Sequence, residues 1–121
     1  MDFSLALDHI QMAIPPGSEA VADSFYVDIL GFVPQEKPPR LAVRGGRWYQ
    51  HGTVSLHLGV DPNFVSSDKA HIALAVTNYD ALVARLHANA ITTQPNDEIE
   101  GVTRCYVRDP FMNRIELIAS T

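Results

Sequence analysis

The sequence is short of several features that define other classes of protein. Its 121 residues contain one cysteine, Cys105, which excludes an internal disulfide framework and a cysteine-cluster zinc site. No apolar run approaches the roughly 18 residues needed to cross a bilayer, and the N-terminus lacks the basic start of a signal peptide. Nine Lys and Arg against 14 Asp and Glu give a net charge of −5, which argues against a nucleic-acid or anionic-membrane binder. We therefore expect one small, soluble, cytoplasmic domain.

The sequence does contain an internal repeat. The segments LDHIQMAI (7–14) and KAHIALAV (69–76) both alternate large aliphatic residues with small or polar ones, which is typical of a strand. Their histidines, His9 and His71, are 62 positions apart. Each segment precedes a helical pattern with apolar residues at i, i+4 and i+8, namely Val21, Phe25 and Ile29, then Leu82, Leu86 and Ala90.

Helix ends and hairpins are predicted at matching places in the two halves. Ser18 is a candidate N-cap and residues 77–80 resemble a capping box, while Gly31 and Asn89 or Ala90 end the helices. Predicted strand pairs follow at 47–50 with 54–58 and at 104–107 with 114–118. The Arg-x-Tyr triplets that begin at Arg47 and Arg104 correspond in this alignment. This alignment puts Cys105 at the position of Trp48 on a predicted strand. We therefore expect the Cys105 thiol to be packed in the protein and not to act as a nucleophile.

The repeat predicts an α+β fold. We expect two tandem βαβββ modules whose curved mixed sheets enclose a cleft, with the helices on the outer face. The predicted bounds are about 5–60 for the first module, 61–68 for a linker and 69–120 for the second. Neither half could cover both faces of its sheet alone, so the modules should pack into one domain or dimerise.

Side chains alternate across a strand, so each predicted strand has two faces. The large aliphatic residues share one face, which we expect to pack against the helices. The opposite faces carry four ionisable side chains at repeat-related positions: His9, His57, His71 and Glu116. Imidazole nitrogens and carboxylate oxygens are ordinary ligands for zinc, iron, manganese and nickel.

Each of these side chains also has an ordinary structural explanation. A strand histidine is commonly a hydrogen-bonded residue, and Glu116 could pair with Arg114 or Arg47. The spacing of the four residues along the chain matches no local metal motif. A metal site is still favoured, because unpaired ionisable groups gathered in one cleft would cost stability without a partner.

These features together resemble the vicinal oxygen chelate superfamily, which includes glyoxalase I, extradiol dioxygenases, fosfomycin-resistance thiol transferases and bleomycin-binding proteins. The resemblance rests on the two modules, on DHIQMAI and AHIALAV, and above all on DPFMNRIEL at 109–117. The last segment departs from the family's usual ending at Met112, where the family usually has glycine. A residue that carries a Cβ must therefore make this turn.

The resemblance implies a divalent metal (Zn, Ni, Mn or Fe) and a homodimer in which the partner chain can supply part of each site. The implied ligands are His9, His71 and Glu116, with His57 as a weaker fourth. The implied chemistry is Lewis-acid catalysis on neighbouring oxygens of a small substrate, of isomerase, lyase or dioxygenase type. Glu116 or His57 would then move the proton.

Candidates for substrate contacts lie in the predicted hairpins and the final turn: Arg47, Trp48, Tyr49, Arg104, Tyr106 and Phe111. Packing and ion pairing within the hairpins are the competing explanation. The alternative to an enzyme is a non-catalytic small-molecule binder of the bleomycin-resistance type, in which Trp48 and Phe111 line a groove. A regulatory or partner-binding domain without chemistry is a third possibility, because a fold does not establish chemistry.

Overall fold

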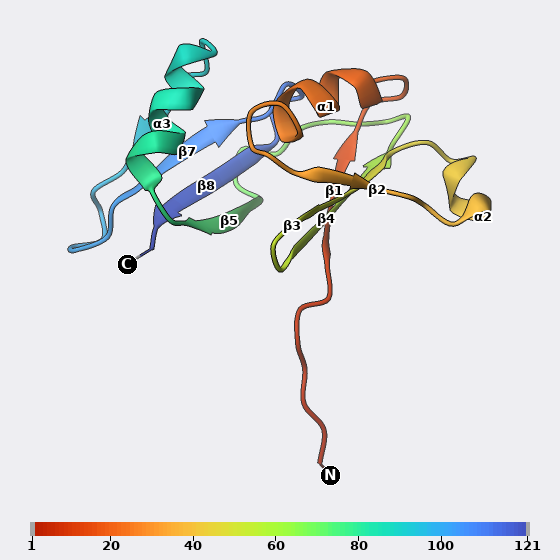
Figure 1. Cartoon of the computed structure of the whole chain (residues 1–121), viewed down its shortest axis with the longest axis horizontal. Helices are drawn as coiled ribbons and strands as arrows, with labels where there is room; N and C mark the ends of the chain where they lie inside the picture. The colour runs from red at the N-terminus through yellow and green to blue at the C-terminus, as the bar shows by residue number, and fades with distance from the viewer. Residues whose placement is uncertain (1, 121) are drawn as a thin grey trace.

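The computed structural model describes residues 2–120 and contains two four-stranded mixed sheets (Figure 1). The first sheet has the order β1-β4-β3-β2, with parallel pairing between β1 and β4. The second has the order β5-β8-β7-β6, with parallel pairing between β5 and β8. Their bounds are β1 Ile10–Ile14, β2 Val33–Gln35, β3 Arg47–His51, β4 Val54–Val60, β5 His71–Val76, β6 Gln94–Pro95, β7 Arg104–Arg108 and β8 Arg114–Ala119. The expected two-module α+β fold is confirmed.

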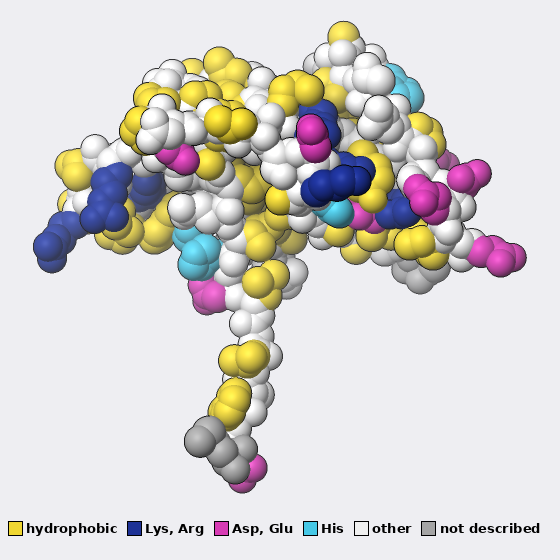
Figure 2. All heavy atoms as spheres, turned by 180° about the vertical axis from the view of Figure 1, so that it is seen from behind, with side chains coloured by type: hydrophobic (Ala, Val, Ile, Leu, Met, Phe, Trp, Pro, Cys, Tyr) yellow, Lys and Arg dark blue, Asp and Glu magenta, His cyan; other side chains and the backbone are white. Residues whose placement is uncertain are grey.

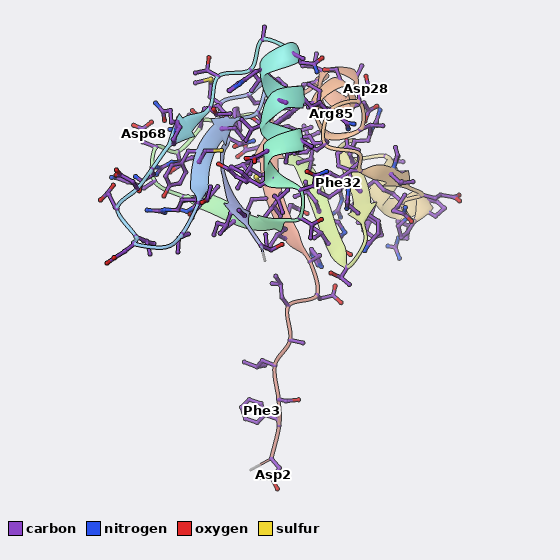
Figure 3. All side chains as sticks on the ribbon, turned by 60° about the vertical axis from the view of Figure 1, so that its left-hand side comes forward. Asp2, Phe3, Asp28, Phe32, Asp68 and Arg85 are labelled. Atoms are coloured by element: carbon purple, nitrogen blue, oxygen red, sulfur yellow. The ribbon has the colours of Figure 1, made fainter. Side chains whose placement is uncertain are left out.

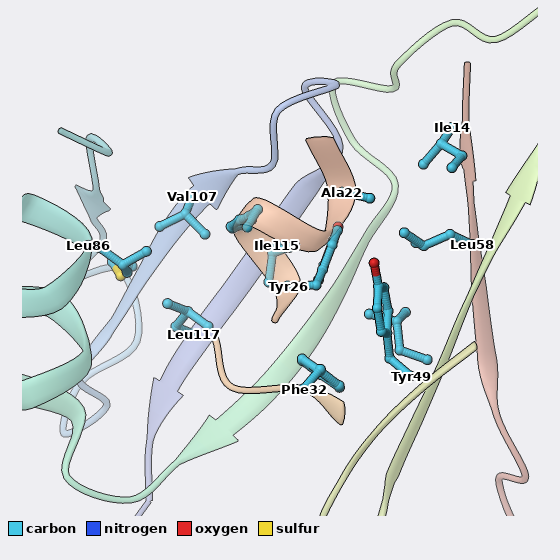
Figure 4. Packing of buried hydrophobic residues seen from close by; sticks show 13 residues of the cluster. Ile14, Ala22, Tyr26, Phe32, Tyr49, Leu58, Leu86, Val107, Ile115 and Leu117 are labelled. Carbon is cyan, nitrogen blue, oxygen red and sulfur yellow. The ribbon is translucent and has the colours of Figure 1, made fainter. Parts of the chain in front are cut away.

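Three helices accompany the sheets: α1 Glu19–Tyr26, α2 Pro39–Ala42 and α3 Tyr79–Ala88. Helix α1 lies between the two sheets, and its buried Tyr26 stacks on Tyr49 of β3 and donates to Asp109, which follows β7 (Figures 1 and 4). In Figure 4, Ile115 and Leu117 of β8 lie on one side of α1, and Leu58 of β4 lies on the other. The two modules therefore share one hydrophobic core.

Strand alternation sorts the side chains as predicted. On the helix-facing side, Leu56, Leu58, Ile115 and Leu117 are at most 1% exposed. Neighbours in register place His57 beside Gln11 and Trp48, and Glu116 beside Ala73 and Tyr106, on the opposite side. We call this opposite side the open face of each sheet. It carries the polar and ionisable residues that the sequence analysis singled out.

The helix predictions need correction in detail. Val21 is 50% exposed, because the buried face of α1 consists of Ala22, Phe25 and Tyr26. The Ser18 hydroxyl donates to the Pro15 carbonyl at 2.6 Å instead of capping the helix. Asn78 precedes α3 with a left-handed backbone and makes no side-chain cap, so the expected capping box does not form.

The predicted alignment of the two hairpins is wrong by one residue. Trp48 is paired with His57 and Tyr106 with Glu116, so Trp48 corresponds to Tyr106. Cys105 is buried on the helix-facing side opposite Leu117, as expected for a packed thiol. The two Arg-x-Tyr triplets suggested the wrong alignment. A shift of one residue moves a side chain to the other face of a strand, so identical residues in the two triplets lie on opposite faces.

One buried carboxylate ties the modules together. Asp109, 3% exposed, accepts hydrogen bonds from the Tyr26 hydroxyl at 2.6 Å and from the backbone N–H of Phe111 and of Asn113. The Asn113 amide also donates to Asp109 at 3.0 Å and to the Ala13 carbonyl at 2.9 Å. The turn between β7 and β8 is thereby attached to α1 and to β1.

The first strand begins later than predicted. Residues 2–9 precede β1, are exposed almost throughout, and extend away from the body of the molecule (Figure 1). We call residues 2–8 the N-terminal arm. Within the described residues, no helix is long and apolar enough to cross a bilayer.

Met112 has a strained backbone in the turn between β7 and β8, and the strain can be tested by substitution. Its φ is 71° and its side chain is 55% exposed, so it adopts the left-handed conformation that suits glycine. We expect Met112→Gly to raise the free energy of unfolding by about 0.5–1 kcal/mol, because relief of the Cβ clash exceeds the extra chain entropy of glycine. Urea denaturation measures this change.

Val65→Gly is the matched control for that substitution. Val65 is 85% exposed but is not among the described residues with positive φ. The control should lower stability, because glycine gains entropy in the unfolded chain and relieves no strain. A loss of stability in Met112→Gly would contradict the strain argument.

Candidate functional site

Two ionisable clusters lie on the open faces, one in each module. In the first, His9 stacks on His57 with ring centroids 4.1 Å apart, and His57 stacks on Trp48 at 4.4 Å. Nδ1 of His9 lies 2.8 Å from the Asp8 carboxylate, and Nε2 of His9 has no hydrogen-bond partner among the described residues. A carboxylate on one ring nitrogen orients the other toward a metal in many metal sites.

The stacked rings line a cleft of about 830 Å³. Its wall mixes polar and apolar side chains, and Gln11, Gln50 and Ser55 come from the strands of the first sheet. Two cations, Lys37 and Arg44, lie at its side and come from the segment around α2. This cleft is large enough for a small-molecule ligand.

His57 has a perturbed ionisation. Burial lowers the pKa of His57 below its ordinary value, and repulsion from the neighbouring His9 lowers it further. His57 is therefore neutral at pH 7 and keeps a lone pair that can accept a proton or bind a metal.

The second cluster joins His71 and Glu116. Nε2 of His71 lies 3.0 Å from Oε1 of Glu116, while Nδ1 of His71 lies 2.8 Å from the Lys69 carbonyl. Both ring nitrogens thus face an acceptor, although a neutral imidazole has only one N–H. His71 thus lies between the Glu116 carboxylate and the Lys69 carbonyl.

Arg104 holds the other oxygen of Glu116. Its guanidinium donates to Oε2 at 3.1 Å, to the Tyr106 hydroxyl at 2.9 Å and to the Asn96 side chain at 2.7 Å. Burial raises the pKa of Glu116, but the hydrogen bonds from Arg104 and His71 outweigh it and hold the pKa below its ordinary value. Glu116 is therefore ionised at pH 7, with Oε1 directed toward His71.

The four predicted ligands form two pairs, His9 with His57 and His71 with Glu116. Among the described residues of one chain, no three His, Cys, Asp or Glu side chains are close enough to hold a metal ion together. Each module therefore presents half of the predicted ligand set.

The six predicted substrate contacts divide between the two sides of the sheets. Trp48 lies in the first cluster, and Arg104 and Tyr106 lie in the second. Arg47 and Tyr49 instead bind Asp23 of α1, with Tyr49 Oη at 2.6 Å. Phe111 packs against the core at the final turn. Arg47 and Tyr49 thus connect the sheet to the helix, while a ligand contact of Phe111 stays a prediction.

Several residues of the two clusters were missed. Asp8 orients His9, and its position directly before the histidine was an available signal. Asn96 binds Arg104 from a loop with no regular pattern, so the spacing along the chain does not reveal it. Arg114 and Arg47 were expected as possible partners of Glu116, but Arg104 takes that place and Arg114 stacks on Tyr106 at 3.8 Å.

The two tandem modules with their ionisable open faces can be compared with known families. The chain belongs to the glyoxalase/bleomycin resistance protein/dioxygenase superfamily, whose family model matches residues 6–117. No match is found among curated protein sequences.

Solved structures show the same fold. A glyoxalase family protein from Bacillus anthracis is 35% identical with a TM-score of 0.94, and the match covers 100% of this chain and 99% of that one. Lactoylglutathione lyase from Agrobacterium tumefaciens is 18% identical with a TM-score of 0.69, covering 92% of each chain. TnmS3, an antibiotic-binding protein from Streptomyces, is 22% identical with a TM-score of 0.71, covering 98% of this chain and 100% of that one. The last two similarities concern the fold alone.

The single tryptophan makes the first cluster measurable. Protonation of His57 places a cation against the face of Trp48, which should change the indole emission. Because burial and His9 lower the pKa of His57, we expect the midpoint of Trp48 fluorescence against pH to lie below about 6.5.

Two variants control the titration. His57→Asn should abolish the fluorescence transition, and His9→Asn should raise its midpoint by removing a neighbouring imidazole. A midpoint at or above the ordinary value, or a transition that persists in His57→Asn, would show that His57 is not the titrating group.

Proposed function

We propose that the protein is a metal-dependent enzyme of the glyoxalase type that works as a homodimer on a small, oxygen-rich substrate. One site would combine His9, with His57 as a fourth ligand, from one chain and His71 with Glu116 from its partner. The family membership and the two half-sets of ligands support this proposal.

The observation that carries the proposal is the spacing of His71 and Glu116. Two ligands about 2.0–2.2 Å from one cation, at a right angle, are about 3 Å apart. Nε2 of His71 and Oε1 of Glu116 are 3.0 Å apart, and both ring nitrogens of His71 face acceptors. A divalent cation fits this pair once it replaces the proton of the hydrogen bond between them, because it then binds the Nε2 lone pair and the carboxylate together.

The chain's own residues would divide the chemical roles. A bound divalent cation supplies Lewis-acid polarisation of neighbouring substrate oxygens. Glu116 is ionised and held by Arg104, which suits a ligand better than a proton donor. His57 is neutral at pH 7 and beside the ligand His9, which makes it the better candidate for proton transfer. Trp48 and Tyr106 would orient the substrate.

A mixed-dimer experiment tests the shared site. His9→Ala and Glu116→Gln should each bind well below one metal ion per chain and should lose turnover of methylglyoxal with glutathione. Glu116→Gln is preferred to alanine, because an amide can still accept from Arg104. Mixing the two variants should restore metal and activity, since a heterodimer contains one intact site. Elemental analysis and turnover measure both.

A mixture of His71→Ala with Glu116→Gln is the control, because both changes lie in the same module and no heterodimer site is intact. Rescue in this mixture as well would contradict a shared site. Wild-type protein that binds no metal after reconstitution would overturn the metalloenzyme. Metal binding without turnover of methylglyoxal would leave the related lyase, isomerase and dioxygenase chemistries as candidates.

A second function is favoured by one feature of the first cluster. The stack of Trp48, His57 and His9 presents flat rings to an 830 Å³ cleft, which suits a planar small molecule. In a non-catalytic binder, such a ligand would change Trp48 fluorescence in the presence of a chelator. Binding that instead requires the metal supports the enzyme.

A further inference from the structure

A second cavity lies between the two modules, and we call it the inter-module cavity. Its volume is about 410 Å³, which falls within the range of about 300–1,000 Å³ that is usual for small-molecule sites. The first module contributes the segment after α1 and the hairpin of β3 and β4 to its walls, and the second contributes the end of β5 and part of α3. The cavity is therefore built only when the two modules are packed together.

The inter-module cavity is separate from both ionisable clusters. The described residues that line it include none that line the 830 Å³ cleft, and none of His71, Arg104 and Glu116. Figure 2 shows histidine and acidic side chains together where the N-terminal arm joins the body on the reverse face. Figure 3 shows Arg85 and Phe32 elsewhere, beside α3 where it approaches the first module. A ligand in this cavity would touch neither cluster.

The floor of the inter-module cavity is apolar. Phe32 and Leu117 are 4% and 0% exposed, and Leu74 of β5 is paired in register with Leu117 of β8. Leu82 of α3 and Val54 of β4 also line the cavity and pack against the same core. A ligand that reaches this floor must present a hydrocarbon surface, because a polar group buried there without a partner is costly.

A single cation lines the cavity, and no anion opposes it. Among the described residues of the lining, Arg85 is the only Lys, Arg, Asp or Glu. Its guanidinium donates to the Ile29 carbonyl at 3.3 Å, and no described carboxylate forms an ion pair with it. A guanidinium has five N–H donors. Arg85 therefore connects α3 to the segment after α1 and keeps donors for an anionic ligand.

Neutral polar side chains complete the lining. Thr77 and Asn78 are exposed, and Asn78 has a φ of 52° and does not cap α3 with its side chain. His51, at the end of β3, places its ring edge against Phe32 with centroids 5.5 Å apart. The hydroxyl, the amide and the imidazole can each donate to an oxygen, and none of them adds a negative charge.

We propose that the inter-module cavity binds a small monocarboxylate with a hydrocarbon body, for which octanoate is the probe. One cation without a counterion matches one negative charge, and the planar guanidinium can pair with both oxygens of a carboxylate. A phosphate monoester carries about two charges at pH 7 and would need a second cation, which the lining lacks. The apolar floor receives the hydrocarbon chain. Binding here requires neither a metal nor the two ionisable clusters.

An NMR titration with octanoate tests the charge of the ligand. Wild-type protein should bind octanoate saturably at pH 7, with amide shifts concentrated in residues 74–85, and should bind 1-octanol at least tenfold more weakly. Arg85→Gln should raise the octanoate dissociation constant by about tenfold or more, because it loses the charge-assisted contact. It should leave 1-octanol binding unchanged. Arg40→Gln is the matched control, since Arg40 is exposed on α2, lines neither cavity, and makes the same change in net charge.

A second pair of variants tests the place of binding. Ala81 is exposed and lines the cavity, so Ala81→Phe should fill it and abolish octanoate binding without disturbing the core. Ala84→Phe puts the same side chain on an exposed position of α3 outside the lining and should bind octanoate like the wild type. Circular dichroism confirms that both variants fold.

The outcomes separate the inter-module cavity from the proposed function. Binding that is lost in Arg85→Gln and in Ala81→Phe supports the site even if the protein binds no metal and turns over no methylglyoxal. The absence of saturable binding, or equal affinity in wild type and Arg85→Gln, overturns it. A Trp48 fluorescence change on octanoate that persists in Ala81→Phe would place the ligand in the 830 Å³ cleft instead. An octanoate-dependent rise in the dimer dissociation constant would assign the cavity to a second copy of the chain, and this also overturns the proposal.

Discussion

The hydrogen bonds of the Asp109 carboxylate are the constraint on which the arrangement of the modules depends. This buried group joins the β7–β8 turn to Tyr26 of α1, and Asn113 extends the connection to the backbone of β1. A buried carboxylate is costly unless such donors surround it, so the turn, the helix and the first strand are held in one geometry. The DPFMN segment therefore supports the fold, whereas Glu116, three residues beyond it, belongs to the ionisable cluster.

With the modules held in this way, one ionisable cluster lies beside each sheet. That separation explains why His9 with His57 and His71 with Glu116 form distinct pairs within one chain. It also explains how the chain tolerates them. The His9 side chain is 43% exposed, whereas Glu116 is buried and has Arg104 as its counterion. Ionisable groups that remain hydrated or paired cost little stability before a partner chain or a metal arrives.

The sequence predicted the parts of the structure that depend on periodicity. The internal repeat and the alternation of aliphatic residues identified both modules and the face on which each ionisable residue lies. The errors arose where tertiary contacts decide the outcome. Val21 fitted the helical period, but the sheet packs one residue further around α1, on Ala22. Arg47 and Tyr49 are the same residue types as Arg104 and Tyr106 and were aligned with them. The true alignment of the two hairpins differs by one residue, so Arg47 and Tyr49 lie on the opposite face and bind Asp23. Arg114 was a candidate partner of Glu116, but Arg104 takes that place and Arg114 stacks on Tyr106. Asn96 had no signal, because its contact joins segments whose meeting only the fold defines.

The small residues of β5 connect the site with the assembly. Ala73 and Ala75 follow His71 and are exposed, so they leave space beside the pair formed by His71 and Glu116. In the proposed homodimer, the open face of one chain is completed by that of its partner. The two half-sets of ligands then come together, so that dimer formation and assembly of the site are one event.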